Sequence, residues 1–171
     1  GVNCFTSGNH IWDKKDIYEY INEADNLVRP INYPTGTPGV GSQVFEYNGF
    51  KIGVINVLGR VFMPPIDSPW QIVVEEIENL KSKNVDSIFI DFHAEATSEK
   101  KALGYYLDGR VSAVFGTHTH VQTADEIILD GKTAYITDAG MCGPVTSVLG
   151  AKKEIAISRF IDDPQKSFEL A

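Results

Sequence analysis

Apolar positions along the chain follow two spacings, one typical of strands and the other of amphipathic helices. Short apolar runs bounded by glycine, proline or asparagine predict strands, and apolar residues three and four positions apart predict helices. The predicted strands cover residues 2–6, 27–30, 43–47, 50–58, 87–93, 111–115, 126–129 and 133–137, with a further strand beginning at Phe168. The predicted helices cover residues 12–22, 69–84, the later part of 94–107, and 151–161, the last of them amphipathic with an apolar face formed by Ile155, Ala156 and Phe160.

Two dipeptides between neighbouring strand runs predict β-hairpins. Asn48-Gly49 joins the third and fourth strands, and Asp130-Gly131 joins the last complete pair; this pairing of residues favours the tight hairpin turn. Apolar strands that alternate with helices indicate an α/β layered fold, and the two hairpins indicate a mixed rather than wholly parallel sheet.

Helix starts are marked by short polar residues. Ser68 is expected to cap the second helix, with Pro69 at its first position and Gln71 as the partner of a capping box. Thr97 or Ser98 is expected to cap the third helix.

Composition places the chain among ordinary globular proteins. Its 171 residues are 43% hydrophobic and 22% charged, which suits one domain spanning residues 1–171. The formal net charge of −8 argues against an extended nucleic-acid surface or an anionic-membrane surface. No apolar run approaches the ~18 residues of a membrane span and no signal peptide is visible, so a cytoplasmic location is expected. Cys4 and Cys142 are too few for a disulfide framework.

All four histidines of the chain lie at or just past the end of a predicted strand. His118 and His120 follow the run 111–115, and in extended backbone residues two positions apart point the same way. Both would then face one cavity at the carboxyl ends of the strands, where ligands of open α/β sheets bind. Such a pair alone is usually a surface accident. His10 and His93 occupy comparable positions, and core packing does not require that pattern, whereas a shared site does.

The side chains at these strand ends suit a transition metal. Imidazole nitrogens with the amide oxygen of Asn9 favour zinc, iron or manganese over magnesium. The nearest carboxylate, Asp91, alternates to the opposite face from Phe92, and its role stays open. Arg60, in the loop 59–67, could clamp a phosphate, but a lone loop arginine is usually solvated. His10 could bind metal, cap the following helix, or donate to a phosphate; in extended backbone it diverges from Asn9.

Three stretches together resemble a known family. Gly8-Asn9-His10 with the following residues 12–15, then 91–100, then 116–125, are similar to the YmdB-type bacterial metallophosphoesterases of the calcineurin-like superfamily. The similarity runs over essentially the whole chain, and the stretches match in order, spacing and flanking residues. The resemblance implies a layered α/β/β/α fold with a mixed sheet and a two-metal site. Iron is the expected metal, with manganese or zinc as alternatives.

The same resemblance implies roles for individual residues. Asn9, His93 and His118 resemble ligands of one metal, and His120 resembles a ligand of the other. His10 resembles the catalytic, unliganded histidine beside the phosphate, which holds a substrate oxygen or protonates the leaving group.

The expected activity is hydrolysis of small phosphodiesters, such as 2′,3′-cyclic nucleotides, through a metal-bridging hydroxide. Alternatives are a phosphomonoesterase or protein phosphatase, and a non-catalytic metal-binding regulatory protein. Homo-oligomer formation is left open. The family's first strand, with a Gly-Asp metal motif, its second strand, ending in Glu-Asn, and its last strand have no counterpart here. We therefore expect a fragment, incomplete at both ends, that binds metal weakly on its own.

Overall fold

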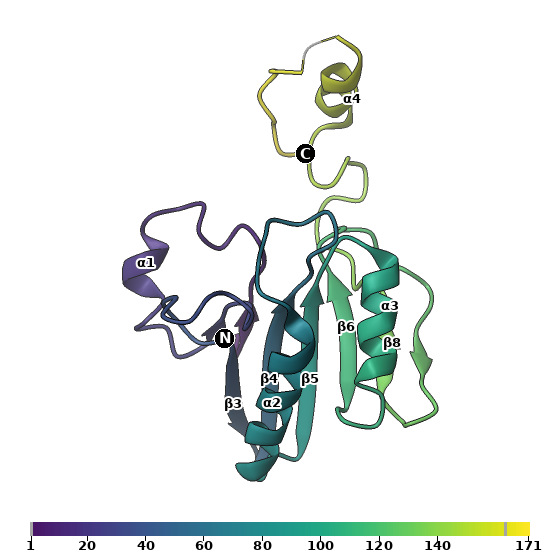
Figure 1. Cartoon of the computed structure of the whole chain (residues 1–171). Coiled ribbons are helices and arrows are strands. Elements are labelled where there is room, and N and C mark those ends of the chain that lie inside the picture. The colour runs from purple at the N-terminus through teal and green to yellow at the C-terminus, as the bar shows by residue number, and fades with distance from the viewer. Residues whose placement is uncertain (1, 163) are drawn as a thin grey trace.

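A six-stranded mixed sheet forms the centre of the protein (Figure 1). The computed structural model describes residues 2–162 and 164–171. The strand order is β3-β4-β5-β6-β8-β7. The four central strands run parallel, and the edge strands β3 and β7 are antiparallel to their neighbours. In that order the strands are Ser42–Tyr47, Phe50–Leu58, Ser87–His93, Ala113–Thr117, Ala134–Ile136 and Ile127–Ile128.

A second, two-stranded sheet lies beside this one. It pairs β1 (Phe5–Thr6) with β2 (Leu27–Val28) in parallel. The Ile31 N–H donates to the carbonyl of Asn56 in β4 at 2.8 Å, so the chain after β2 is tied to the main sheet. Both predicted hairpins form, and the α/β class with a mixed sheet is confirmed.

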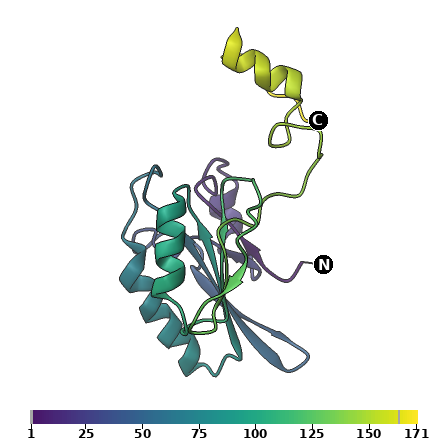
Figure 2. The same cartoon turned by 90° about the vertical axis from the view of Figure 1, so that its right-hand side faces the viewer.

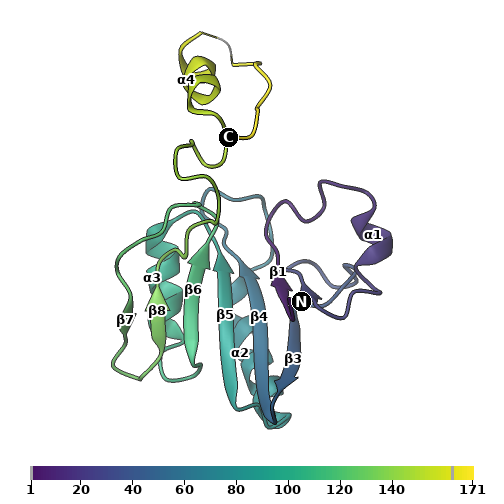
Figure 3. The same cartoon turned by 180° about the vertical axis from the view of Figure 1, so that it is seen from behind.

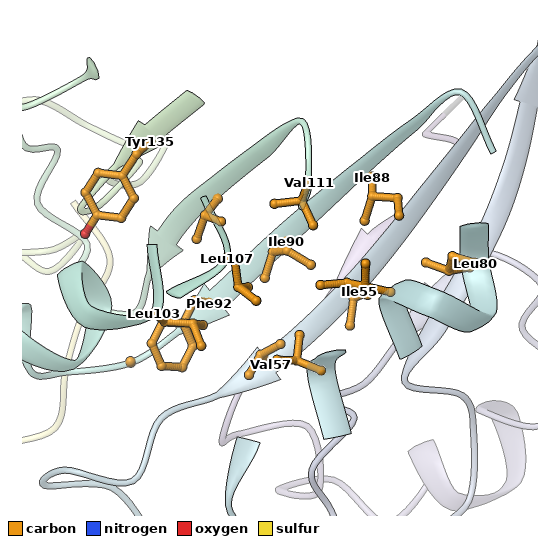
Figure 4. Packing of buried hydrophobic residues seen from close by; sticks show 14 of the residues in the cluster. Ile55, Val57, Leu80, Ile88, Ile90, Phe92, Leu103, Leu107, Val111 and Tyr135 are labelled. Carbon is orange, nitrogen blue, oxygen red and sulfur yellow. The ribbon is translucent and has the colours of Figure 1, made fainter. Parts of the chain in front are cut away.

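Two helices, α2 (Pro69–Ser82) and α3 (Thr97–Tyr106), cover one face of the main sheet (Figures 1 and 3). Alternate residues of β5 point toward them, as strand geometry requires. Figure 4 shows the resulting core between helices and sheet. Its fully buried members include Ile55, Val57, Val73, Ile77, Leu80, Ile90, Phe92, Leu103 and Leu107.

The prediction of a helix over residues 12–22 is mostly wrong. Only α1 (Ile17–Tyr20) is helical, and the residues before it form turns closed by bonds such as the Asp13 N–H to the His10 carbonyl. Most helical stability in proteins comes from packing an apolar face. No residue of α1 is buried, and of the apolar residues in this stretch only Ile21, directly after α1, is buried, so a helix over the whole stretch would have little apolar contact to stabilise it.

Both capping expectations are wrong in detail. Ser68 occupies the position before α2, but its side chain makes no capping bond, and the Gln71 amide donates to Glu75 at 2.9 Å instead. The residue before α3 is Ala96, which has no side-chain acceptor. The start of α2 lies where the sequence placed it, and α3 begins at Thr97, one of the two residues expected to cap it.

The last helix, α4 (Lys153–Ile161), begins two residues later than predicted and lies beyond the carboxyl ends of the strands (Figure 2). Ile155 and Ala156 are buried as expected, but Phe160 is 90% exposed because α4 is not packed on the sheet. The strand expected to begin at Phe168 is absent from the described residues; only Leu170 forms an isolated bridge, with Ala151.

Gly116 of β6 lies against the segment after β8, and its carbonyl accepts a bond from the Ala139 N–H at 2.8 Å. A β-carbon at this position would overlap the backbone carbonyl of Thr137. We expect Gly116→Ala to lower the free energy of unfolding by about 1–3 kcal/mol, because the crowded atom is backbone and cannot rotate away. Denaturant unfolding of both proteins measures this difference.

The matched control is Gly143→Ala. Its added methyl would meet only the flexible end of Met141. A stability loss at Gly143 as large as that at Gly116 would show that the effect is general to glycine replacement.

Candidate metal centre

Three of the predicted ligands meet at the carboxyl ends of the central strands. His93 is the last residue of β5, His118 follows β6 directly, and Asn9 lies in the turn after β1. Asn9 Oδ1 lies 2.9 Å and His118 Nδ1 lies 3.1 Å from His93 Nε2. The two imidazole rings meet edge to face with centroids 4.9 Å apart. A side chain at Gly8 would overlap the His93 ring, so glycine there lets the turn approach closely.

The spacing and charge state of these atoms fit one metal ion. Neighbouring ligand atoms that each bind an ion at ~2.1 Å, at right angles, lie ~3.0 Å apart. Burial, and then the nearby His118 and Lys100, lower the pKa of His93 to about 4. Burial also lowers the pKa of His118, although Glu95 opposes this. Both imidazoles are therefore neutral at pH 7, which is the form that binds metals.

The ligand set provided by the described residues is partial. Within residues 2–162 and 164–171, no group of three or more histidine, cysteine, aspartate or glutamate side chains surrounds a common metal position. The cluster instead combines two imidazoles with the amide of Asn9, so it supplies neutral ligands without a carboxylate.

The backbone of the stretch 118–120 turns sharply, and the prediction that it is extended is wrong. β6 ends at Thr117, and His118 and His120 have φ angles of 103° and 65°. His118 still reaches His93. His120 is exposed and lines a groove of about 710 Å³ with residues of the C-terminal segment, including Leu149 and Phe168. The structure therefore joins His118, but not His120, to the cluster of Asn9 and His93.

A buried ion pair fixes this turn. Lys100 Nζ of α3 lies 2.7 Å from Asp138 Oδ2, and both side chains are 1% exposed. The same carboxylate accepts bonds from the Thr119 N–H, the Thr119 hydroxyl and the Gly140 N–H at 2.8 to 3.1 Å. Burial alone would raise the pKa of Asp138, but the bonds from Lys100, Gly140 and Thr119 outweigh it and lower that pKa. The residue between the two histidines is thus anchored to the body of the protein.

Residues 1–171 match the family model described as YmdB-like protein. The chain belongs to the YmdB-like family.

Named relatives and solved structures resemble the chain over its whole length. The YmdB-like chain is 55% identical over 171 residues to a Bacillus subtilis protein named 2′,3′-cyclic-nucleotide 2′-phosphodiesterase, matching 100% of this chain and 64% of that protein. A hypothetical protein from Thermus thermophilus superposes with a TM-score of 0.90 at 43% identity, over 100% of this chain and 66% of that one. A structure described as a novel phosphatase from Mycoplasma pneumoniae superposes with a TM-score of 0.85 at 43% identity. The match covers 100% of this chain and 62% of that one. The chain spans slightly less than two thirds of the length of these proteins.

His10 of the YmdB-like chain lies outside the cluster formed by its neighbour. Its Nδ1 lies 2.9 Å from Asp13 Oδ2, and its side chain is 78% exposed. Asn9 turns toward His93 while His10 turns toward Asp13, so the two adjacent side chains contact different groups.

Arg60 occupies the loop that leaves β4 beside the site. The Gly59 N–H donates to the His93 carbonyl at 2.9 Å, and the backbone N–H groups of Arg60 and Val61 donate to the buried carboxylate of Glu99. These bonds place the start of the loop next to His93. The Arg60 side chain is exposed, as expected for a lone loop arginine.

Two carboxylates at the site were not singled out by the sequence. Glu95, two residues past β5, lies 3.2 Å from His118 Nε2. Asp138, just past β8, holds Thr119. Both stand immediately after strand runs, so the strand-end pattern that selected the histidines could have been extended to acidic residues. The partnership of Lys100 with Asp138 has no such signal, because a helix lysine is normally solvated. In the described part of the chain, no helix is long and apolar enough to cross a membrane.

Proposed function

We propose that this YmdB-like chain forms part of a metal-dependent phosphodiesterase that hydrolyses small phosphodiesters such as 2′,3′-cyclic nucleotides in the cytoplasm. The observation that carries the proposal is the convergence of Asn9, His93 and His118 at distances of 2.9 and 3.1 Å. The name of the Bacillus subtilis relative, with which the chain shares 55% identity, supports the substrate class.

Each residue has a separate task in this proposal. Asn9, His93 and His118 would hold one ion, and His120 would contribute to a second. Iron is our first choice, with manganese or zinc as alternatives, because imidazole and amide ligands suit these metals. Metal ions in such a site supply Lewis acidity and a nucleophile at neutral pH. His10, which is exposed and paired with Asp13, would donate a proton or a hydrogen bond to a phosphate that enters the site.

The charge of the chain favours a small substrate. At a formal net charge of −8, the chain as a whole repels the many phosphates of a long nucleic acid. A single phosphodiester carries one negative charge, so the chain repels it far less than it repels a long nucleic acid.

A substrate panel tests the proposal. The protein encoded by the full reading frame, loaded with iron or manganese, is assayed with a 2′,3′-cyclic nucleotide, bis(p-nitrophenyl) phosphate, p-nitrophenyl phosphate and a structured RNA. We expect the cyclic nucleotide to have the highest kcat/KM and a chelator to abolish turnover, because the charge on the phosphoryl oxygens is neutralised by metal.

Two other outcomes of the substrate panel would each favour a different function. Faster turnover of the monoester would assign a phosphatase, the activity after which the Mycoplasma pneumoniae structure is named. Absence of turnover with two metals bound would indicate a non-catalytic metal-binding protein. His93→Ala serves as the control that removes a proposed ligand.

A further inference from the structure

Thr117 links a buried carboxylate to the imidazole of His93. It is the last residue of β6 and pairs in register with His93 of β5. Its hydroxyl donates to Asp91 Oδ1 at 2.7 Å, and the same oxygen lies 3.0 Å from His93 Nδ1. Asp91 is 2% exposed and lies on the same face of β5 as His93, two residues earlier.

The direction of these bonds selects one tautomer of His93. A threonine hydroxyl has one hydrogen to donate and otherwise only lone pairs. Because that hydrogen goes to Asp91, the oxygen can only accept from His93, so His93 carries its proton on Nδ1. The neutral ring then has its lone pair on Nε2, which faces Asn9 Oδ1 and His118 Nδ1.

The tautomer of His118 is fixed in the same way, but by a different partner. Its Nε2 lies 3.2 Å from the Glu95 carboxylate, which can only accept when ionised. The proton of neutral His118 is thus held on Nε2, and the lone pair on Nδ1 faces His93. Two ring lone pairs and the Asn9 oxygen then meet with no proton between them, an arrangement that a cation relieves.

We propose that Thr117, backed by Asp91, is a positioning residue that locks His93 in the Nδ1–H tautomer and so presents Nε2 to a metal ion. The role of this tautomer in metal binding rests on the proposed function, but the tautomer itself is a property of the metal-free chain. Without the hydroxyl, His93 is free to move its proton to Nε2 and donate to Asn9, which would occupy the lone pair that binds metal. The low exposure of Asp91 strengthens the lock, because a charge-assisted bond is not weakened by water.

The test is nitrogen-15 NMR of the histidine rings in the metal-free chain at pH 8. We expect wild-type His93 to be protonated on Nδ1. Thr117→Val has nearly the same shape but no hydroxyl, so the ring should shift toward the Nε2–H form. Thr117→Ser should retain the wild-type signal. The exposed Thr146→Val is the matched control and should change nothing.

Metal affinity gives an independent measurement. In the protein from the full reading frame, Thr117→Val should bind metal about 10–100-fold more weakly, as expected when the outer partner of a ligating histidine is removed, and Thr117→Ser should bind nearly normally. If the valine variant does not fold, Thr117→Ala tests the same loss with less bulk. An unchanged tautomer in a folded variant that lacks the hydroxyl overturns the proposal. A shifted tautomer in a protein that hydrolyses no phosphoester would uphold it and reject the proposed function.

Discussion

Replacing Lys100 by methionine is expected to lower the free energy of unfolding by about 3–5 kcal/mol, which is the range for breaking one side of a buried ion pair. Methionine fills a similar volume, so the loss comes from the charge rather than from a cavity. Asp138, 1% exposed, would lose its cation, and only the bonds from Gly140 and Thr119 would still oppose the effect of burial, which raises its pKa. Denaturant unfolding at pH 7 measures the loss.

Lys101→Met is the matched control in the next position of α3. Lys101 lies 3.4 Å from Asp125 but is 49% exposed, and exposed pairs contribute about 0–1 kcal/mol. The double variant Lys100→Met with Asp138→Leu should recover only part of the stability, because the N–H groups of Thr119 and Gly140 lose their acceptor. Equal losses at Lys100 and Lys101 would contradict the assignment of the pair as a stabilising anchor.

Replacing His10 by alanine is expected to reduce turnover by about 10²–10⁴-fold, the usual contribution of general acid catalysis, while both metals stay bound. The structure separates His10 from the cluster of Asn9 and His93, since its Nδ1 contacts Asp13 instead. The reduction should be smaller for a substrate with a nitrophenolate leaving group, which needs no proton. Kinetics on both substrate types, with elemental analysis of the same samples, make the measurement in the protein from the full reading frame.

Lys14→Ala is the control for His10, because it is an exposed residue of the same turn. It should leave turnover within a small factor of wild type. Loss of a metal from His10→Ala would make His10 a ligand, and equal slowing of both leaving groups would make it an oxygen clamp. Either result rejects the acid role.

The strands, the hairpins and part of the site could be predicted because they depend on short-range information. Asn48 and Gly49 have φ angles of 51° and 83°, the left-handed values that this dipeptide adopts readily in a tight hairpin. His93 and His118 come together because β5 and β6 are parallel neighbours, and residues at the carboxyl ends of parallel strands share one edge of a sheet.

The predictions that were wrong concern features that depend on residues far away in the sequence. The stretch 12–22 has helical spacing, but whether it forms a helix depends on a surface to pack on, which local sequence does not show. The turn at 118–120 takes its shape from Asp138, nineteen residues beyond Thr119, and from a lysine in another helix. Phe160 was assigned to a buried face because periodicity identifies an apolar stripe without identifying what covers it.

The anchoring of Thr119 limits how far the site can be treated as a portable motif. The stretch 116–120 contains both histidines, yet its two left-handed φ angles are imposed by groups on α3 and after β8. Grafted onto the end of a strand in another sheet, the same five residues would relax to ordinary backbone and separate the imidazole from its partners. A protein engineer who wished to move this site would have to transplant Lys100 and Asp138 with it.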